Sequence, residues 1–425
     1  MSKFFLIVGC AHSRVPDLEQ ICLYVKQAYQ LKTILLAKKP KDNAYNICDV
    51  VFDMNLTDEN FLESALSNIS EYPIKGGLLF SDESIKNGPS LFKNLGILCD
   101  EQELGRNAYS KLSFRKHEEK YLSTYGTDDI FRPCYKEVTS FSDVLNFAKD
   151  NPEGFILKPV SEAASRGVLK LNISSDLEKS FKELECYAHG GLICETLIPF
   201  NREFSFDGFS TFSFLTEKIV SSGQYPVEIG QVLPADISVE EASRIKSHGI
   251  IMNSLTGQKI GAFHNEIGYI DSTHQTASIE ANRRPGGMGI WNLAEKVYGH
   301  NLYQLLVDAA MGKNLSDILF EPQGKAITCM LGSAEDLIDD LEPHIDLINK
   351  EFEINIIDNI EILSFRWINT QPQGVPLIPK SNHDFIAEVY VYSSKSTLPT
   401  KLMFSAVQNA WNKSLHIVKK RKLIA

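Results

Sequence analysis

Short apolar runs alternate with amphipathic helical patterns through the first part of the chain, and this alternation restricts the fold more than any other feature. The apolar runs are 4–8, 33–36, 49–52 and 77–80. Helical spacing of apolar residues occupies 16–29 and 57–68 between them. Buried strands that alternate with helices are typical of a parallel sheet covered by helices. The sequence therefore predicts an N-terminal parallel α/β domain over residues 1–108.

Further along the chain, the spacing predicts a compact segment and then an antiparallel sheet. The compact segment has strand patterns at 154–159, 168–171 and 192–195, around a helix at 176–187. From Glu203 onward phenylalanines alternate with polar residues, as in antiparallel strands with one buried face. Helical spacing returns at 240–255, 291–298 and 302–311. The predicted fold class is α/β, with α+β character in the C-terminal half.

Composition narrows the class of protein. A chain of 425 residues corresponds to about three domains. The net charge of −11 argues against nucleic acid as the main partner. No apolar stretch approaches the ~20 residues of a membrane span. The eight cysteines form no C-x-x-C pair, so we expect reduced thiols, a cytoplasmic location and no membrane partner. A homodimer is the default expectation for assembly.

The run 279–287 combines oxygen ligands with a guanidinium. In a strand, Glu280, Asn282 and Arg284 share one face, while Ile279 and Ala281 lie on the opposite, packable face. The two oxygen ligands suit a hard cation such as Mg²⁺, and the arginine suits a phosphate or an oxyanion. Arg283 points away and is expected in a salt bridge. A surface strand end with unrelated charges is the alternative.

Together with charged residues upstream, this run resembles the ATP-grasp superfamily of carboxylate–amine ligases. The upstream residues are, in order, Lys111 at a helix start, Lys158 and Glu195 at strand ends, Glu203 after a polar turn, and Glu266. The resemblance covers about residues 1–315, and the L-amino acid ligases, which join amino acids into dipeptides, are the most similar branch. It implies an ATP-grasp fold with four parts: an N-terminal parallel α/β domain (1–108), a small lid subdomain (109–190), a larger antiparallel-sheet domain (191–315) and a C-terminal α+β extension of that domain (316–425).

The resemblance implies a site for ATP. Lys111 and Lys158 match the lysines that neutralise the phosphates, and Lys158 would also serve the chemistry. The small-residue loop 161–167 matches a flexible lid over the phosphates. The residues that would contact ATP in the lid and in the adenine hinge, with the ribose ligand last, are Ser165, Arg166, Gly167, Glu195, Thr196, Leu197 and Glu203.

The resemblance also implies a metal and substrate site. Glu266, Glu280 and Asn282 match ligands for two Mg²⁺ ions, with Mn²⁺ as the alternative metal. Arg284 would be catalytic at the acyl-phosphate. The residues expected near the substrates are Gln231, His264, Arg284 and Gly287. Relatives often have histidine where Gln231 stands, and glutamine cannot titrate near neutral pH, so removing a proton from the amine would need another group or water.

The predicted function is therefore ATP-dependent ligation of small molecules. A carboxylate, expected to be an amino acid, would be activated as an acyl-phosphate and joined to an amine, expected to be a second amino acid. Two alternatives stay open at this point. One is another ATP-grasp chemistry, such as a bicarbonate-dependent carboxylase, and the other is a non-catalytic ATP-binding regulatory protein.

Overall fold

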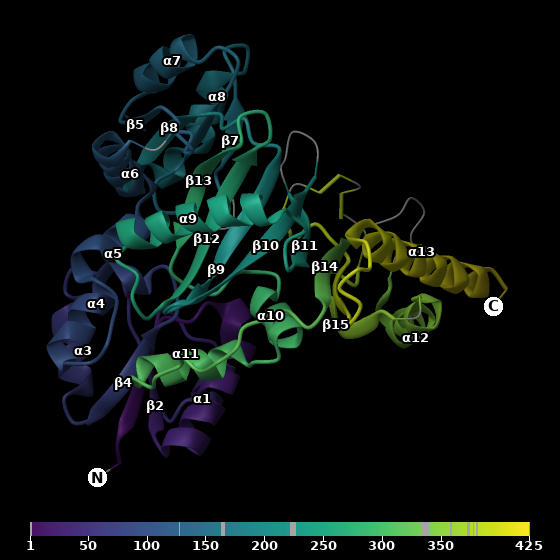
Figure 1. The fold of residues 1–425 in the computed structure, drawn as a ribbon, viewed down its shortest axis with the longest axis horizontal. Coiled ribbons are helices and arrows are strands. Elements are labelled where there is room, and N and C mark those ends of the chain that lie inside the picture. The colour runs from purple at the N-terminus through teal and green to yellow at the C-terminus, as the bar shows by residue number, and fades with distance from the viewer. Residues whose placement is uncertain are drawn as a thin grey trace.

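Three sheets organise the computed structural model of the chain (Figure 1). The structure describes residues 2–126, 128–162, 166–221, 227–332, 340–357, 359–371, 375–376, 378–379 and 381–424. No helix in these ranges is long and apolar enough to cross a lipid bilayer.

The N-terminal sheet is parallel, with the strand order β3-β2-β1-β4. Its strands are β1 (Phe4–Val8), β2 (Lys32–Ala37), β3 (Val50–Asp53) and β4 (Ile74–Leu79). Its helices are η1 (His12–Arg14), α1 (Val15–Tyr29), α2 (Asp42–Ile47), α3 (Phe61–Ile69), α4 (Ser84–Leu95) and α5 (Gln102–Tyr109). Both faces of β1 are buried, because α1 packs on one and α3 and α4 on the other. The parallel α/β prediction is confirmed.

The second sheet is small and antiparallel, with the order β5-β8-β6-β7. Its strands are β5 (Tyr135–Val138), β6 (Phe155–Pro159), β7 (Leu169–Leu171) and β8 (Leu192–Thr196). Its helices are α6 (Lys111–Tyr125), α7 (Phe141–Asp150), α8 (Leu177–Glu183) and η2 (Glu185–Gly190). The Ser110 hydroxyl accepts a hydrogen bond from the backbone N–H of Ser113, so it caps α6 and fixes where Lys111 begins the helix.

The third sheet has eight antiparallel strands in the order β13-β12-β9-β10-β11-β14-β16-β15. The strands are β9 (Arg202–Phe209), β10 (Phe212–Val220), β11 (Glu228–Leu233), β12 (Ala262–Ile270), β13 (Gln275–Asn282), β14 (Lys325–Leu331), β15 (Glu361–Trp367) and β16 (Ala387–Ser393). The helices are α9 (Val239–Leu255), α10 (Ile290–Tyr298), α11 (Leu302–Ala310), η3 (Glu342–His344), α12 (Ile345–Asn355) and α13 (Thr400–Ile424). The last three strands of the chain therefore continue the sheet that β9 begins.

The two faces of the large sheet differ. Apolar side chains on the back face pack against α9 at one end and against α12 and α13 at the other. On the front face, α10 and α11 cover one end of the strands and tie the sheet to the N-terminal domain, where α11 lies beside α1 (Figure 1). The remaining part of the front face is polar, and it faces the small sheet. The fold therefore leaves a polar surface between the large sheet and the small sheet.

Candidate active site

A cavity of about 1810 Å³ lies over this polar surface and receives side chains from the small sheet, the large sheet and the segment η1–α1 of the N-terminal domain. The predicted site residues that line it are Lys111, Lys158, Arg166, Glu195, Thr196, Leu197, Glu203, His264, Glu266, Glu280, Arg284 and Gly287. Gly167, Gln231 and Asn282 are not among its lining residues. Ser165 lies outside the described residues. Residues that are up to 176 positions apart in the sequence (Lys111 to Gly287) are thus brought to one cavity.

Strand register explains why the polar side chains gather on one face. Residues directly opposite each other in antiparallel strands project from the same face of a sheet. One such cross-strand row contains Glu203, Lys218, Gln231, Thr328, Tyr390 and Ser364, taken from β9, β10, β11, β14, β16 and β15. Four members of this row, Glu203, Lys218, Tyr390 and Ser364, line the cavity.

The two glutamates predicted to bind metal lie side by side. Glu266 on β12 is directly opposite Glu280 on β13. Like charges in this arrangement repel, so each carboxylate needs a cation. Lys218 Nζ lies 2.5 Å from Glu266 Oε1, and Lys111 Nζ lies 2.7 Å from Glu280 Oε1. Burial alone would raise the pKa of Glu266, but Lys218 and His264 hold that pKa well below its ordinary value.

Lys218 was not found by the sequence analysis. Its buried ammonium also lies 3.3 Å from Glu203 Oε1 and 3.7 Å from Glu228 Oε2. Burial opposes its charge, but these glutamates together with Glu266 raise the pKa of Lys218 well above its ordinary value. Burial, with the nearby Glu266 and Glu228, raises the pKa of Glu203 to about 7. The alternation that points Phe214 inward on β10 also points Lys218 inward, so the signal was present in the strand pattern.

Lys158 is held by a second buried ion pair. Its Nζ lies 2.6 Å from Glu195 Oε2, while Arg115 Nε donates to Glu195 Oε1 at 2.9 Å. Burial opposes ionisation of Glu195, yet the two cations lower its pKa to about 2. Burial lowers the pKa of Lys158. Both oxygens of Glu195 thus have cationic partners, and Arg115, which sequence analysis passed over, organises them. The adenine contact expected of Glu195 stays a prediction.

The two adjacent arginines separate as predicted. Arg283 is buried and forms an ion pair with Asp100, whose other oxygen accepts three backbone N–H groups at 2.9 Å. Arg284 lines the cavity, and its Nε donates to Asp82 Oδ2 at 2.6 Å. Asp82 Oδ1 also accepts the backbone N–H of Arg283 at 3.0 Å. A carboxylate from the loop after β4 therefore fixes the direction of the Arg284 side chain.

The prediction for Ile279 was wrong. It was placed on the face opposite Glu280, but both side chains line the cavity. The register of β12 and β13 shifts between Glu266, which faces Glu280, and Ile267, which faces Ser278. Ile279 is the extra residue of this β-bulge, and a bulge breaks the alternation of side chains between faces.

The remaining predicted residues lie around the glutamates. His264 Nδ1 is 2.6 Å from Asp207 Oδ1, and its Nε2 is 3.3 Å from Glu266 Oε1. Burial opposes its charge, but Asp207 and Glu266 raise the pKa of His264. Gln231 Nε2 donates to Glu228 Oε1, and within the described chain its buried Oε1 has no hydrogen-bond partner. The buried Nδ2 of Asn282 is likewise without a partner among the described residues.

These oxygens fit a hard divalent cation. Two adjacent carboxylates and a nearby amide are the donors that Mg²⁺ prefers, and such sites are completed by phosphate oxygens and water. Asn282 lies two residues from Glu280 on the same strand, and its unpartnered atom is the donor Nδ2, so only its side-chain oxygen could bind the cation. In the described ranges, no three His, Cys, Asp or Glu side chains are grouped so that they could hold a metal by themselves.

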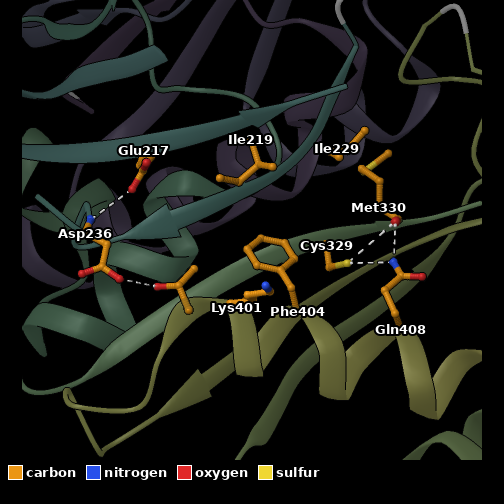
Figure 2. A pocket seen from close by; sticks show the side chains of 10 residues that line it. Glu217, Ile219, Ile229, Asp236, Cys329, Met330, Lys401, Phe404 and Gln408 are labelled. Carbon is orange, nitrogen blue, oxygen red and sulfur yellow. Dashed lines mark hydrogen bonds between the residues drawn. The ribbon is translucent and has the colours of Figure 1, made fainter. Parts of the chain in front are cut away.

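A second, smaller cavity lies on the back face of the large sheet. Its volume is about 680 Å³, and Figure 2 shows Phe404 projecting from α13 toward Ile219 and Ile229 on the strands above it. Gln408 Nε2 contacts the carbonyl oxygen of Met330 and the Cys329 sulfur, which fastens α13 to β14 (Figure 2). None of the predicted site residues lines this cavity.

Comparison with known proteins identifies the fold. No protein-family model and no curated protein matches the sequence. Among solved structures, the L-amino acid ligase from Bacillus licheniformis superposes with a TM-score of 0.72 at 16% identity, covering 97% of this chain and 98% of that one. The N5-carboxyaminoimidazole synthetase from Staphylococcus aureus, complexed with ADP, gives 0.67 at 15% identity, covering 95% and 98%. Phosphoribosylglycinamide synthetase from Anaerococcus prevotii gives 0.64 at 15% identity, covering 96% and 98%. The chain has the fold of these ATP-grasp ligases, as the sequence predicted.

Proposed function

We propose that this protein is an ATP-dependent carboxylate–amine ligase. It activates a carboxylate, an amino acid, as an acyl-phosphate and joins it to an amine, a second amino acid, with release of ADP and phosphate. One observation carries the proposal: four cations and two adjacent carboxylates converge on the cavity between the sheets, in the fold of known ligases. The cations are Lys111, Lys158, Lys218 and Arg284.

The chemistry has two steps, and the residues serve both. In the first, an oxygen of the substrate carboxylate attacks the γ-phosphorus of ATP, and ADP leaves. In the second, the amine attacks the acyl carbon, and phosphate leaves with that oxygen. Lys111 and Lys158 offset phosphate charge, while Arg284 stabilises the transferred phosphoryl group and the oxyanion of the second step. Asp82 keeps Arg284 in one direction.

Glu266, Glu280 and Asn282 would hold the magnesium. When bound, Mg²⁺ orients the β- and γ-phosphates and offsets the charge that develops on them. In that state, Lys111 and Lys218 neutralise the carboxylates from the other side. The ADP complex of the synthetase from Staphylococcus aureus supports a nucleotide site in this fold. The small sheet closes over the cavity and excludes water from the acyl-phosphate.

A direct assay tests the proposal. The protein is incubated with ATP, Mg²⁺ and pairs of amino acids, ADP is followed by a coupled assay, and products are identified by mass spectrometry. We expect ADP release that requires a carboxylate, together with a product whose mass equals both substrates less one water. ADP release that never depends on a carboxylate would contradict the ligase function. Release supported by bicarbonate without an amino acid would favour a carboxylase.

A non-catalytic role makes a different prediction. Such a protein would bind ATP tightly and turn over none of the acid–amine pairs. The adjacent glutamates and Arg284 argue for turnover, because a nucleotide switch needs no arginine aimed at the transferred group. We also propose that the protein acts in the cytoplasm, since all eight cysteines are unpaired. Assembly as a homodimer stays a prediction.

A further inference from the structure

The segment that joins β13 to α10 follows Arg284 directly and becomes buried at once. Pro285 and Gly286 are buried, whereas Gly287 is exposed and lines the cavity. A buried backbone carbonyl needs a hydrogen-bond donor from the protein when water cannot reach it. The donors that these two carbonyls find therefore fix the path of the segment, and with it the backbone from which the Arg284 side chain projects.

Arg14 supplies such donors from the N-terminal domain. It is the last residue of η1, in the connection between β1 and α1. Its Nη2 donates to the carbonyl oxygen of Pro285 at 2.6 Å and also to that of Gly286. The carbonyl oxygen of Pro285 accepts a second hydrogen bond, from Nη1 of Arg284 at 3.0 Å. One backbone carbonyl thus joins the two guanidinium groups.

The Arg14 side chain is itself held in place. Its Nη1 donates to Asp17 Oδ2 at 2.9 Å, and the two side chains are only 13% and 12% exposed. Asp17 lies in the first turn of α1, where a negative charge is favoured by the helix dipole. Because Asp17 offsets its charge and both of its Nη atoms have partners, Arg14 is suited to hold the backbone of the segment.

The large sheet confines Gly286 from another side. A Cβ atom on Gly286 would lie 2.9 Å from Nδ1 of His264 and 3.1 Å from Oδ1 of Asp207. Such distances leave no room for a side chain, so the backbone can run this close to the pair only because residue 286 is glycine. Contacts from the sheet and from Arg14 together leave the segment one position.

These contacts connect the N-terminal domain to the arginine proposed for phosphoryl transfer. We propose that Arg14 is a positioning residue, which holds Pro285 and Gly286 so that Arg284 keeps its guanidinium in the cavity. The inference rests on the proposed ligase function. Asp82 holds Nε of Arg284 from the loop after β4. Two segments of the N-terminal domain therefore act on one arginine, Asp82 on its side chain and Arg14 on its backbone.

Steady-state kinetics of Arg14 variants test the inference. Arg14→Gln should lower kcat about tenfold and leave the KM for ATP little changed, because a misplaced Arg284 weakens the transition state more than it weakens nucleotide binding. Arg14→Lys, which keeps a charged donor, should recover part of the loss. Added guanidinium ion should restore part of the activity of Arg14→Ala, since the missing side chain lines the cavity. Arg244→Gln is the matched control, because Arg244 forms ion pairs on α9 and does not line the cavity.

A double-mutant cycle shows whether Arg14 acts through Arg284. In an Arg284→Lys background, Arg14→Gln should lower kcat little further, because the group to be positioned is already lost. Losses that multiply in the double variant would overturn the positioning role, because Arg14 would then act independently of Arg284.

The ion pair of Arg14 requires a control for folding. Arg14→Gln leaves the buried Asp17 without its cation, so the double variant Arg14→Gln with Asp17→Asn restores the balance of charge. We expect the same fall in kcat in the single and the double variant. A fall that disappears in the charge-balanced variant, or that follows a lowered urea midpoint, would overturn the inference.

Hydrogen–deuterium exchange separates this inference from the ligase function, because it needs no turnover. In Arg14→Gln, peptides that span residues 283–290 should exchange about tenfold faster, and those of β9 and β12 should exchange as in wild type. Faster exchange confined to this segment supports the positioning role even if no acid–amine pair turns over. Unchanged exchange, or a rise spread over the whole N-terminal domain, would overturn the positioning role and leave the ligase function to its own assay.

Discussion

The two halves of the cavity floor use the same strand architecture for different tasks. On the half formed by β13, β12, β9 and β10, every cation is paired inside the site, as Lys218 with Glu266 and Lys111 with Glu280. On the half formed by β16 and β15, Arg366 pairs with the buried Glu388 and is itself largely exposed. The first arrangement balances charge within the protein until a nucleotide and metal enter. The second places a single buried ion pair at the edge of the cavity, with the guanidinium exposed.

The two halves of the cavity would select their ligands in different ways. A set of internally paired charges can accept phosphates and a metal ion, because these exchange partners with groups already present. An open guanidinium discriminates between substrates that carry an acid and those that do not. Variants that disturb one half should therefore change different measured quantities from variants of the other.

Replacing Glu280 should have the largest effect. Glu280→Gln removes one of two adjacent carboxylates and leaves Lys111 without its partner. We expect kcat to fall about 10³-fold, as when one preorganised electrostatic group is lost from a site. Measurement of ADP release across a magnesium titration checks this. Glu361→Gln, which removes an exposed partner of Lys296, is the control and should behave like wild type. A Glu280 variant with normal turnover would disprove the metal site.

Replacing the buried Lys218 should mainly lower the stability of the folded protein. Lys218→Met leaves Glu203, Glu228 and Glu266 without their shared cation. Breaking a buried ion pair on one side typically costs about 3–5 kcal/mol of unfolding free energy. Urea denaturation of the two proteins measures the difference. Lys182→Met removes an exposed lysine paired with Glu178 and should leave the midpoint where it is. A stable Lys218 variant would mean that its carboxylates are neutral in the folded protein.

The link from the N-terminal domain to Arg284 should matter less. Asp82→Asn keeps the size of the side chain but weakens its hold on Arg284 Nε. We expect kcat to fall roughly tenfold to a hundredfold, about 1.4–2.8 kcal/mol, with the KM for ATP little changed. Steady-state kinetics decide it. An effect confined to the KM for ATP would show that Asp82 serves nucleotide binding and not the orientation of Arg284.

The pH dependence of stability should separate two buried glutamates, and this is the smallest effect. The raised pKa of Glu203, about 7, means that its folded form keeps a proton that the unfolded form releases above about 4.5. Neutral Glu203 therefore contributes fully to the stability of the folded protein below pH 4.5, and this contribution is lost as the pH rises to 7. Glu195, with its pKa lowered to about 2, contributes stability above pH 4.5 and loses it only in acid.

Urea denaturation at pH 5 and pH 8 tests this difference. The wild type should lose on the order of 2–3 kcal/mol from Glu203 across this interval. Glu203→Gln should remove that loss and flatten the profile. Glu195 should add no slope in the same window, because it is ionised throughout. Equal slopes for wild type and Glu203→Gln would show that Lys218 keeps Glu203 ionised.

Much of the fold and part of the candidate site could be predicted from the sequence. Apolar alternation located the parallel strands and most helices, and the order of charged residues indicated the cavity that gathers them. The orientation of Ile279 was predicted wrongly because it depends on a β-bulge. The bulge arises from the pairing of β13 with β12, and the alternation within one strand does not reveal it. Lys218 was missed because a lone lysine is usually solvated. Only the folded structure brings three glutamates to its ammonium group. The position of Arg366 opposite Glu388 depends on the pairing of β15 with β16. Both strands lie beyond residue 315, where the resemblance ends.

In the proposed reaction, a substrate carboxylate becomes an acyl-phosphate in this cavity. The measurement that tests it most directly uses an acid substrate labelled with ¹⁸O in its carboxylate, with ATP, Mg²⁺ and an amine, and analyses the phosphate released. We expect each phosphate formed to carry one ¹⁸O atom from the acid, in step with the formation of product. Phosphate that is released without the label would contradict it, because the γ-phosphoryl group would then have passed to water.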